Sequence, residues 1–162
     1  MEKLRLYDNF GNKTDIVVNR GEKFDEKLGN ILLSVVLIKD KDKILLQKTS
    51  SSRNSEYAFT GGHVTFDETP LNTIVREVKE ELGLDTKKEQ YKLLKQIKNP
   101  NRPCILFVYL LEQKVNLNEL KYQKEEVENV YMLTKEEIES LLENDNFRKS
   151  SKLIYEEVKD II

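Results

Sequence analysis

The chain has 162 residues, 38% of them apolar and 35% charged, and its 27 basic and 29 acidic side chains leave a formal net charge of -2. This composition excludes an intrinsically disordered chain, and the charge balance gives no overall attraction to nucleic acid or to an anionic membrane. We expect residues 1–162 to form a single domain. Its longest apolar run is too short to span a bilayer. Cys104 is the one cysteine, which excludes an internal disulfide and favours a reducing cytoplasm.

The first half of the chain has the pattern of short strands joined by polar turns. Two strand-like runs flank a turn that contains Gly11, which predicts an N-terminal hairpin; with the polar connector that follows, it makes up segment 1–28. The later runs are apolar and rich in β-branched residues, as is typical of buried strands. The serine-rich stretch 49–56 predicts a flexible loop. Strands are expected at 4–8, 14–18, 31–38, 43–47 and 57–60.

A helix is predicted between Thr69 and Gly83. Thr69 suits the N-cap, Pro70 the first helical position, and Gly83 the position just past the last turn. Thr134, with a glutamate three residues later, predicts a capping box that opens a helix to about residue 142. Strands are expected at 91–97, 104–111 and 130–133, and a final helix at 147–162. This order indicates the α/β or α+β class, with a mixed sheet flanked by helices.

Three glutamates share one side of the predicted helix 70–82. At about 100° per residue, Glu77, Glu80 and Glu81 fall in one sector. We expect this sector to lie away from the core, because the apolar residues form a separate stripe. That stripe consists of Leu71, Val75, Val78 and Leu82. The acids repel one another and oppose the helix dipole. A solvated acidic face is the ordinary explanation, whereas a bound divalent cation would turn the repulsion into ligation.

The residues around this helix match a longer motif. Residues 62–84 read GHVTFDETPLNTIVREVKEELGL, which fits G-x(5)-E-x(7)-R-E-U-x-E-E-x-G-U, with U aliphatic, at every fixed position. The chain thereby resembles the Nudix hydrolase family, and the order of its elements is similar to the Nudix fold over most of its length. The resemblance implies a mixed sheet sandwiched between helices. It also implies hydrolysis of a diphosphate linkage in a small phosphorylated substrate, such as a nucleotide, with Mg²⁺ or Mn²⁺ as cofactor.

The resemblance implies roles for individual residues. Glu80 and Glu81 match metal ligands of the family, and Glu77 matches a residue that serves as a further ligand or as a catalytic base. The backbone carbonyl of Gly61, just before the motif, would complete the metal shell. The expected catalytic set is Glu77, Glu80 and Arg76, with Arg76 acting through an ion pair that orients a glutamate of the motif.

Two further expectations concern acids around the helix. Glu68 matches a residue that supports the site by pairing with Arg76. Many members of the family add a metal ligand from a downstream loop, where this chain offers Glu125, Glu126 and Glu128. We favour Glu126, although an exposed charged loop explains these three residues equally well.

Arg53, Phe59 and His63 are the candidates for substrate binding. Arg53 would contact a phosphate and Phe59 would stack on a base, with ordinary surface exposure and strand packing as the alternatives. His63 would contact a phosphate or bond to the backbone. Cys104 lacks a neighbouring base in the sequence and is interpreted as a buried residue rather than a nucleophile. The lysines and arginines are scattered without interleaved aromatic residues, which predicts no nucleic-acid partner.

Two other functions share some of these features. Residues 4–60 are similar to the N-terminal part of isopentenyl diphosphate isomerase, but that family uses a cysteine and several histidines, and His63 is the only histidine here. A non-catalytic ligand sensor on the same scaffold would have little need for the acidic cluster. An exposed edge of the N-terminal hairpin would allow a homodimer.

Overall fold

The computed structural model describes residues 2–162. Its strands are β1 (Lys3–Tyr7), β2 (Lys13–Asn19), β3 (Ile31–Asp40), β4 (Lys43–Thr49), β5 (Tyr57–Ala58), β6 (Thr60–His63), β7 (Tyr91–Lys98), β8 (Cys104–Glu112) and β9 (Val127–Thr134). Its α-helices are α1 (Pro70–Leu82), α2 (Lys135–Leu141) and α3 (Lys149–Val158). Within the described residues, every helix is too short or too polar to cross a membrane.

The larger sheet is mixed, with β3 at its centre. β3 pairs in parallel with β8 along one edge, and antiparallel with β6 along the other edge at residues 33–36. β4 pairs with β3 only at the tight turn between them, and then leaves it to pair with β9 and β5. The sheet therefore divides, with β4 and β6 on the two sides of the division. The Thr60 hydroxyl of β6 donates a hydrogen bond across it to Gln47 of β4.

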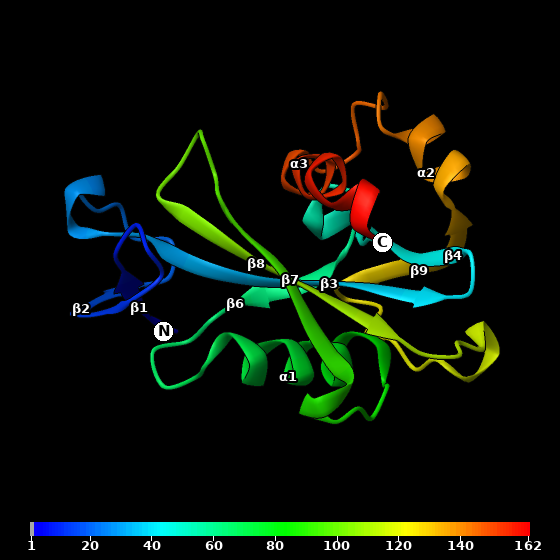
Figure 1. Ribbon diagram of the computed structural model, residues 1–162, viewed down its shortest axis with the longest axis horizontal. Coiled ribbons are helices and arrows are strands. Elements are labelled where there is room, and N and C mark those ends of the chain that lie inside the picture. Colours follow the sequence, from blue (N-terminus) through cyan, green and yellow to red (C-terminus); the bar gives the residue numbers. More distant parts are fainter. Residues whose placement is uncertain (1) are drawn as a thin grey trace.

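Helices cover both faces of this sheet. α1 lies on one face, and α2 and α3 lie on the other (Figure 1). Ile74, Val78 and Leu82 of α1 are fully buried in one core cluster, and Ile154 and Val158 of α3 are fully buried in a second. Each such side chain contributes about 1.5–3 kcal/mol through its removal from water. The expected mixed sheet between helices is confirmed.

The N-terminal strands form a separate hairpin, as predicted. β1 and β2 pair antiparallel and bury a small cluster of their own, made by Leu4, Leu6 and Val18. Two backbone hydrogen bonds of 2.7 and 2.8 Å join Tyr7 to Asn30 and so attach the hairpin just before β3. In Figure 1 the hairpin lies to the left of the main sheet.

Several segments differ from the sequence prediction, and the run predicted as one strand over 57–60 forms two strands, of which β5 pairs with β4 and β6 with β3. β9 begins at Val127, three residues early, because its pairing with β4 continues to Thr49. The final helix ends at Val158 and continues as a 3-10 turn over residues 159–161. The serine-rich stretch contains an ordered 3-10 turn over residues 51–53, and the Ser50 hydroxyl donates to the Glu125 carbonyl at 2.6 Å. This loop is therefore anchored to the segment that leads into β9.

Candidate active site

Local sequence fixes where α1 begins and ends. The Thr69 hydroxyl accepts a hydrogen bond from the Asn72 N–H at 3.1 Å, and Pro70 occupies the first helical position. A cap of this kind stabilises a helix by about 1 kcal/mol. Gly83 ends the helix in the left-handed region, at a φ of 72°, which costs glycine little. These boundaries agree with the prediction and place the acidic cluster at the C-terminal end of α1.

The acidic side of α1 is not turned away from the core, so that prediction was wrong. Glu81 is 7% exposed and the Glu77 side chain 14%, whereas the Glu80 side chain is 47% exposed. The reason is that α1 packs beneath β6, where Gly62 has no side chain and the Glu77 carboxylate fills the space that a Cβ would need. The buried residues of the helix are Thr73, Ile74, Val78, Glu81 and Leu82, while Leu71 and Val75 of the predicted stripe are only half-buried.

Arg76 links three of the motif's carboxylates. Its Nε and Nη2 donate to the two oxygens of Glu68 at 2.7 and 2.9 Å, and its Nη1 donates to Glu77 at 2.9 Å and to Glu80 at 3.1 Å. The hydrogen bonds from Arg76, helped by two threonine hydroxyls, lower the pKa of Glu68 to about 2. The ion pair that the sequence predicts between Arg76 and Glu68 is thus present, in a two-pronged form that holds both groups in place.

The surroundings of Glu77 disfavour the ionised form of its carboxyl group. Burial raises the pKa of Glu77 to about 7. Arg76 opposes this rise, and the negative charges of Glu80 and Glu126 add to it. A carboxyl group with a pKa near neutrality is suited to accept and release a proton at physiological pH.

Glu81 is more strongly perturbed. Burial, followed by the charges of Glu77 and Glu126, raises its pKa to about 8. The Gln47 side chain and the backbone N–H of Gly61 offset part of this rise. Among the described residues, the Oε1 atom of Glu81 has no hydrogen-bond partner. A buried carboxylate oxygen without a partner is costly, unless a cation or a ligand satisfies it.

The residues present fit a divalent metal by their chemistry. Within residues 2–162, no three acidic, histidine or cysteine side chains are gathered closely enough to hold an ion as they lie, and Glu77 and Glu80 are turned towards Arg76. The unpartnered oxygen of Glu81 nevertheless lies at the same helix end as the other two acids, and carboxylate oxygens are what Mg²⁺ prefers. Gly61, predicted as a carbonyl ligand, lies beside Glu81 with its N–H near the carboxylate.

Arg53 and Glu126 join the site from outside the motif. Nη2 of Arg53 lies 3.0 Å from a carboxylate oxygen of Glu126. Glu126 is also close enough to the helix for its charge to raise the pKa of both Glu77 and Glu81. Glu128 pairs instead with a lysine of β4, at 4.0 Å. Of the three downstream acids, Glu126 is therefore the one whose charge acts on the acidic cluster.

A family model described as the NUDIX domain matches residues 32–156, which is most of the chain. The chain belongs to the NUDIX family. It is a Nudix-type pyrophosphohydrolase, an enzyme that acts on phosphoanhydride bonds. A sequence comparison with curated proteins gives no match.

Solved structures share the Nudix fold at low sequence identity. The DR0079 protein of Deinococcus radiodurans has a TM-score of 0.79 and 15% identity, over 96% of this chain and 98% of that one. A MutT NUDIX hydrolase from Burkholderia pseudomallei has a TM-score of 0.62 and 18% identity, over 80% and 98%. A bifunctional NMN adenylyltransferase/ADP ribose pyrophosphatase from Francisella tularensis, complexed with AMP and a Mn ion, has a TM-score of 0.66 and 21% identity, over 81% and 41%. At these identities the likeness concerns the fold.

His63, the first residue after Gly62 in the Nudix motif, lies in a basic environment. Burial, together with the positive charges of Arg20, Arg102 and Arg53, lowers the pKa of His63 to about 4. His63 also lines a pocket with Arg20 and Arg102. Arg20 was missed by sequence reasoning, because nothing in the polar connector around it indicates that it approaches the Nudix motif.

Phe59 and Cys104 are both buried in the protein core. Phe59 is 3% exposed, packs in the core beneath α3, and donates its backbone N–H to the Ser151 hydroxyl at 3.1 Å. Its ring is therefore not available to stack on a base, so the prediction that Phe59 binds substrate was wrong, and the alternative of strand packing holds. Cys104 is fully buried at the start of β8, and burial raises the pKa of its thiol to about 11. It is a core residue and not a nucleophile.

Proposed function

We propose that this chain catalyses the divalent-metal-dependent hydrolysis of a diphosphate linkage in a nucleoside diphosphate derivative, with Mg²⁺ or Mn²⁺ as cofactor. One observation carries the proposal: Glu77 and Glu81 lie largely buried beside each other with pKa values raised to about 7 and 8, and one oxygen of Glu81 has no partner among the described residues. Gathering acids in this way is unfavourable for folding alone and becomes favourable when they share a cation.

Individual residues would divide the chemistry as follows. Glu80 and Glu81, with Glu77 or Glu126, would hold the cation. A bound divalent cation neutralises charge on phosphate oxygens and polarises the phosphorus for attack. Glu77, if it is not a ligand, is suited by its pKa of about 7 to take a proton from the attacking water. Water adds to one phosphorus, the bond to the bridging oxygen breaks, and two phosphorylated products leave.

Arg76 and Glu68 would hold the carboxylates of the site in position. Both oxygens of Glu68 hold the guanidinium of Arg76, which in turn fixes the carboxylates of Glu77 and Glu80 through hydrogen bonds of 2.9 and 3.1 Å. Orientation of a base and its neighbours within a small tolerance is a large part of catalysis in phosphoryl transfer.

The test is a hydrolysis assay with a substrate panel. ADP-ribose, nucleotide sugars and nucleoside triphosphates would be incubated with the purified chain in Mg²⁺, in Mn²⁺ and in EDTA, and the phosphorylated products separated by chromatography. We expect turnover of at least one compound with metal and none in EDTA. Glu77→Gln should lower kcat by at least a hundredfold, because it removes the group that carries the proton.

A matched control variant distinguishes the loss of a catalytic group from a general effect of replacing a glutamate. Glu112→Gln makes the same chemical change at an exposed position at the end of β8 and should leave kcat unchanged. Tight nucleotide binding without turnover would favour the sensor and refute the enzyme. Isomerisation of isopentenyl diphosphate without phosphate release would favour the isomerase and refute hydrolysis.

We also propose a cytoplasmic location and leave the homodimer as a hypothesis with its own test. The single cysteine is buried and unbonded, which suits a reducing compartment. The β1–β2 hairpin exposes Phe10 and Val17, whose side chains are apolar and would suit a second copy. A monomeric mass in light scattering at working concentration would exclude the dimer.

A further inference from the structure

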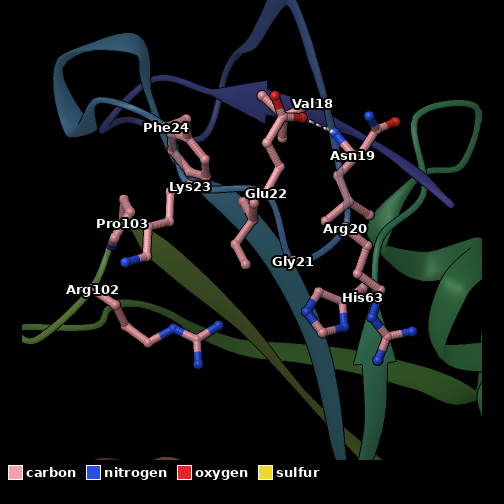
Figure 2. Close-up of a pocket in the computed structure, with 12 residues that line it drawn as sticks. Val18, Asn19, Arg20, Gly21, Glu22, Lys23, Phe24, His63, Arg102 and Pro103 are labelled. Carbon is pink, nitrogen blue, oxygen red and sulfur yellow. Dashed lines mark hydrogen bonds between the residues drawn. The ribbon is translucent and has the colours of Figure 1, made fainter. Parts of the chain in front are cut away.

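A pocket of about 530 Å³ lies between the N-terminal hairpin and the main sheet. Its walls come from the segment that follows β2, from the start of β3, from His63 at the end of β6, and from the loop before β8 (Figure 2). Binding sites for small molecules measure about 300–1,000 Å³. The pocket is therefore large enough for a substantial part of a nucleotide, and it is built from segments that meet only in the folded chain.

Positive charge dominates the rim of this pocket. Arg20, Lys23 and Arg102 line it against a single acid, Glu22, whose carboxylate already accepts the Asn19 N–H at 2.7 Å. Figure 2 shows the Lys23 amine and the Arg102 guanidinium on one side of the space, and Arg20 on the other side next to His63.

Two of these cations have no acid close to them. Among the described residues, Lys23 and Arg102 have no carboxylate oxygen within 4.0 Å, while Arg20 lies 3.3 Å from Glu2 at the molecular surface. Charged side chains that converge without partners are the arrangement expected for binding an anion.

The floor of the pocket is apolar. Leu4 and Val18 are buried there, Phe24 and Ile31 are half-buried, and Pro103 closes one side. An inorganic anion would gain nothing from this surface. The combination of an apolar floor and a cationic rim suits an organic group that itself carries negative charge, such as a phosphorylated nucleoside.

The pocket adjoins the acidic cluster through β6. His63 directly follows Gly62, where the Glu77 carboxylate fills the space that a Cβ would need, so neighbouring residues of β6 border the pocket and the acidic cluster. His63 pairs with Leu33, which places its side chain on the sheet face opposite α1, whereas the Ser34 hydroxyl next to it bonds to the start of α1. A substrate whose diphosphate lies at β6 would thus extend into the pocket along that face.

We propose that Arg20, Lys23 and Arg102 bind a phosphate monoester on the nucleoside portion of the substrate, so that the enzyme prefers diphosphates whose nucleoside carries this additional phosphate. This inference rests on the proposed function for the position of the diphosphate. The pocket then acts as the specificity site of the reaction: its apolar floor holds the organic part, and its cationic rim distinguishes a phosphorylated from an unphosphorylated nucleoside.

The test uses two ligands that differ by one phosphate. NADP⁺ and NAD⁺ have the same diphosphate linkage, and only NADP⁺ carries a phosphate on the adenosine ribose. Their affinities for the full chain would be measured by calorimetry in EDTA, where hydrolysis does not interfere. We expect the unchanged chain to bind NADP⁺ about tenfold more tightly, as one charge-assisted contact at a partly exposed site predicts.

Variants assign the preference to the pocket. Arg102→Gln and Lys23→Gln should each reduce the NADP⁺ to NAD⁺ affinity ratio to threefold or less while leaving NAD⁺ affinity unchanged. Lys27→Gln removes the same charge from an exposed position in the same connector, outside the lining, and should keep the tenfold ratio. Thermal unfolding would check that each variant is folded.

The outcomes separate this inference from the proposed function. Equal affinity for the two ligands, no measurable NADP⁺ binding, or an unchanged ratio in both pocket variants would overturn the specificity site, even if the enzyme hydrolyses diphosphates. A tenfold NADP⁺ to NAD⁺ affinity ratio in EDTA, together with no turnover of any panel compound in Mg²⁺ or Mn²⁺, would refute the hydrolase. The phosphate-binding site would still be supported by that result.

Discussion

Replacing Glu81 with glutamine should make the metal-free protein more stable at alkaline pH. In the folded chain Glu81 is 7% exposed and its pKa is about 8 instead of 4.5. A raised carboxyl pKa means that the folded state binds the proton more tightly than the unfolded state does. The stability that the protonated Glu81 carboxyl group contributes is therefore fully present below pH 4.5 and is lost as the pH rises through 8. Glutamine has a similar shape and no charge to acquire, so it avoids this loss.

The size of the effect follows from the pKa. At about 1.4 kcal/mol for each factor of ten, a rise from 4.5 to about 8 corresponds to about 4–5 kcal/mol if it is fully expressed. Water entry and side-chain relaxation lower the penalty of a buried charge. We therefore expect Glu81→Gln to raise the free energy of unfolding by about 2 kcal/mol at pH 8. For a chain of this length, that is a rise in Tm of about 4–8 °C.

Urea unfolding in EDTA, followed by circular dichroism at pH 5 and pH 8, measures this difference. The variant and the unchanged protein should be nearly equally stable at pH 5 and should separate at pH 8. Added Mg²⁺ or Mn²⁺ should then stabilise the unchanged protein and not the variant, because a ligand stabilises only a fold that binds it. Glu80→Gln is the control, since that side chain is 47% exposed and should change stability by less than about 0.5 kcal/mol. A Glu81→Gln protein less stable than the original at pH 8 in EDTA would refute the reasoning.

Three other expectations concern the same site. If both Glu77 and Glu81 bind the metal, its uptake should release protons and tighten about fiftyfold between pH 6 and 7, because carboxyl groups with pKa values of about 7 and 8 must both ionise. Calorimetry in buffers of different ionisation enthalpy would detect the released protons, and the absence of proton release would count against these two ligands. Arg76→Lys should lower the free energy of unfolding by about 1–2 kcal/mol in urea titrations, because lysine cannot reproduce the two-pronged contact with Glu68; an unchanged midpoint would contradict it. Gly62→Ala should cut turnover at least tenfold by displacing the Glu77 carboxylate, and full activity would show that this close approach is unimportant.

Local features of the fold were predictable because short-range chemistry determines them. The Thr69 cap, the Pro70 start and the Gly83 end of α1 each depend on one residue and its immediate neighbours, and all three agree with the structure. The Thr134 capping box of α2 agrees for the same reason. Strand ends were less accurate, as at Val127, because they depend on how far a partner strand continues.

The sequence predicted which residues form the site, but not how deeply they are buried or which residues surround them. The motif gave the glutamates and the Arg76 pair, but a helical wheel cannot know that Gly62 leaves room for Glu77 or that Gln47 and Gly61 approach Glu81. Those neighbours come from other strands, so the burial that shifts the carboxyl pKa values is a tertiary property.

The pocket beside the motif illustrates the same limit. Arg20 and Arg102 are 82 positions apart in the sequence, and only the attachment of the hairpin to the start of β3 brings them to one rim. Phe59 shows the converse error: an aromatic residue next to the motif satisfied the sequence criteria for base stacking, yet its strand turns the ring into the core.

The sharing of one guanidinium by three carboxylates affects how kinetic data on this enzyme are to be understood. Removing Glu68, Glu77 or Glu80 leaves the other two to rearrange around Arg76, so the effects of single and double substitutions will not sum. A loss of rate after one exchange therefore reports on the whole network, and double-mutant cycles are needed to apportion it among its members.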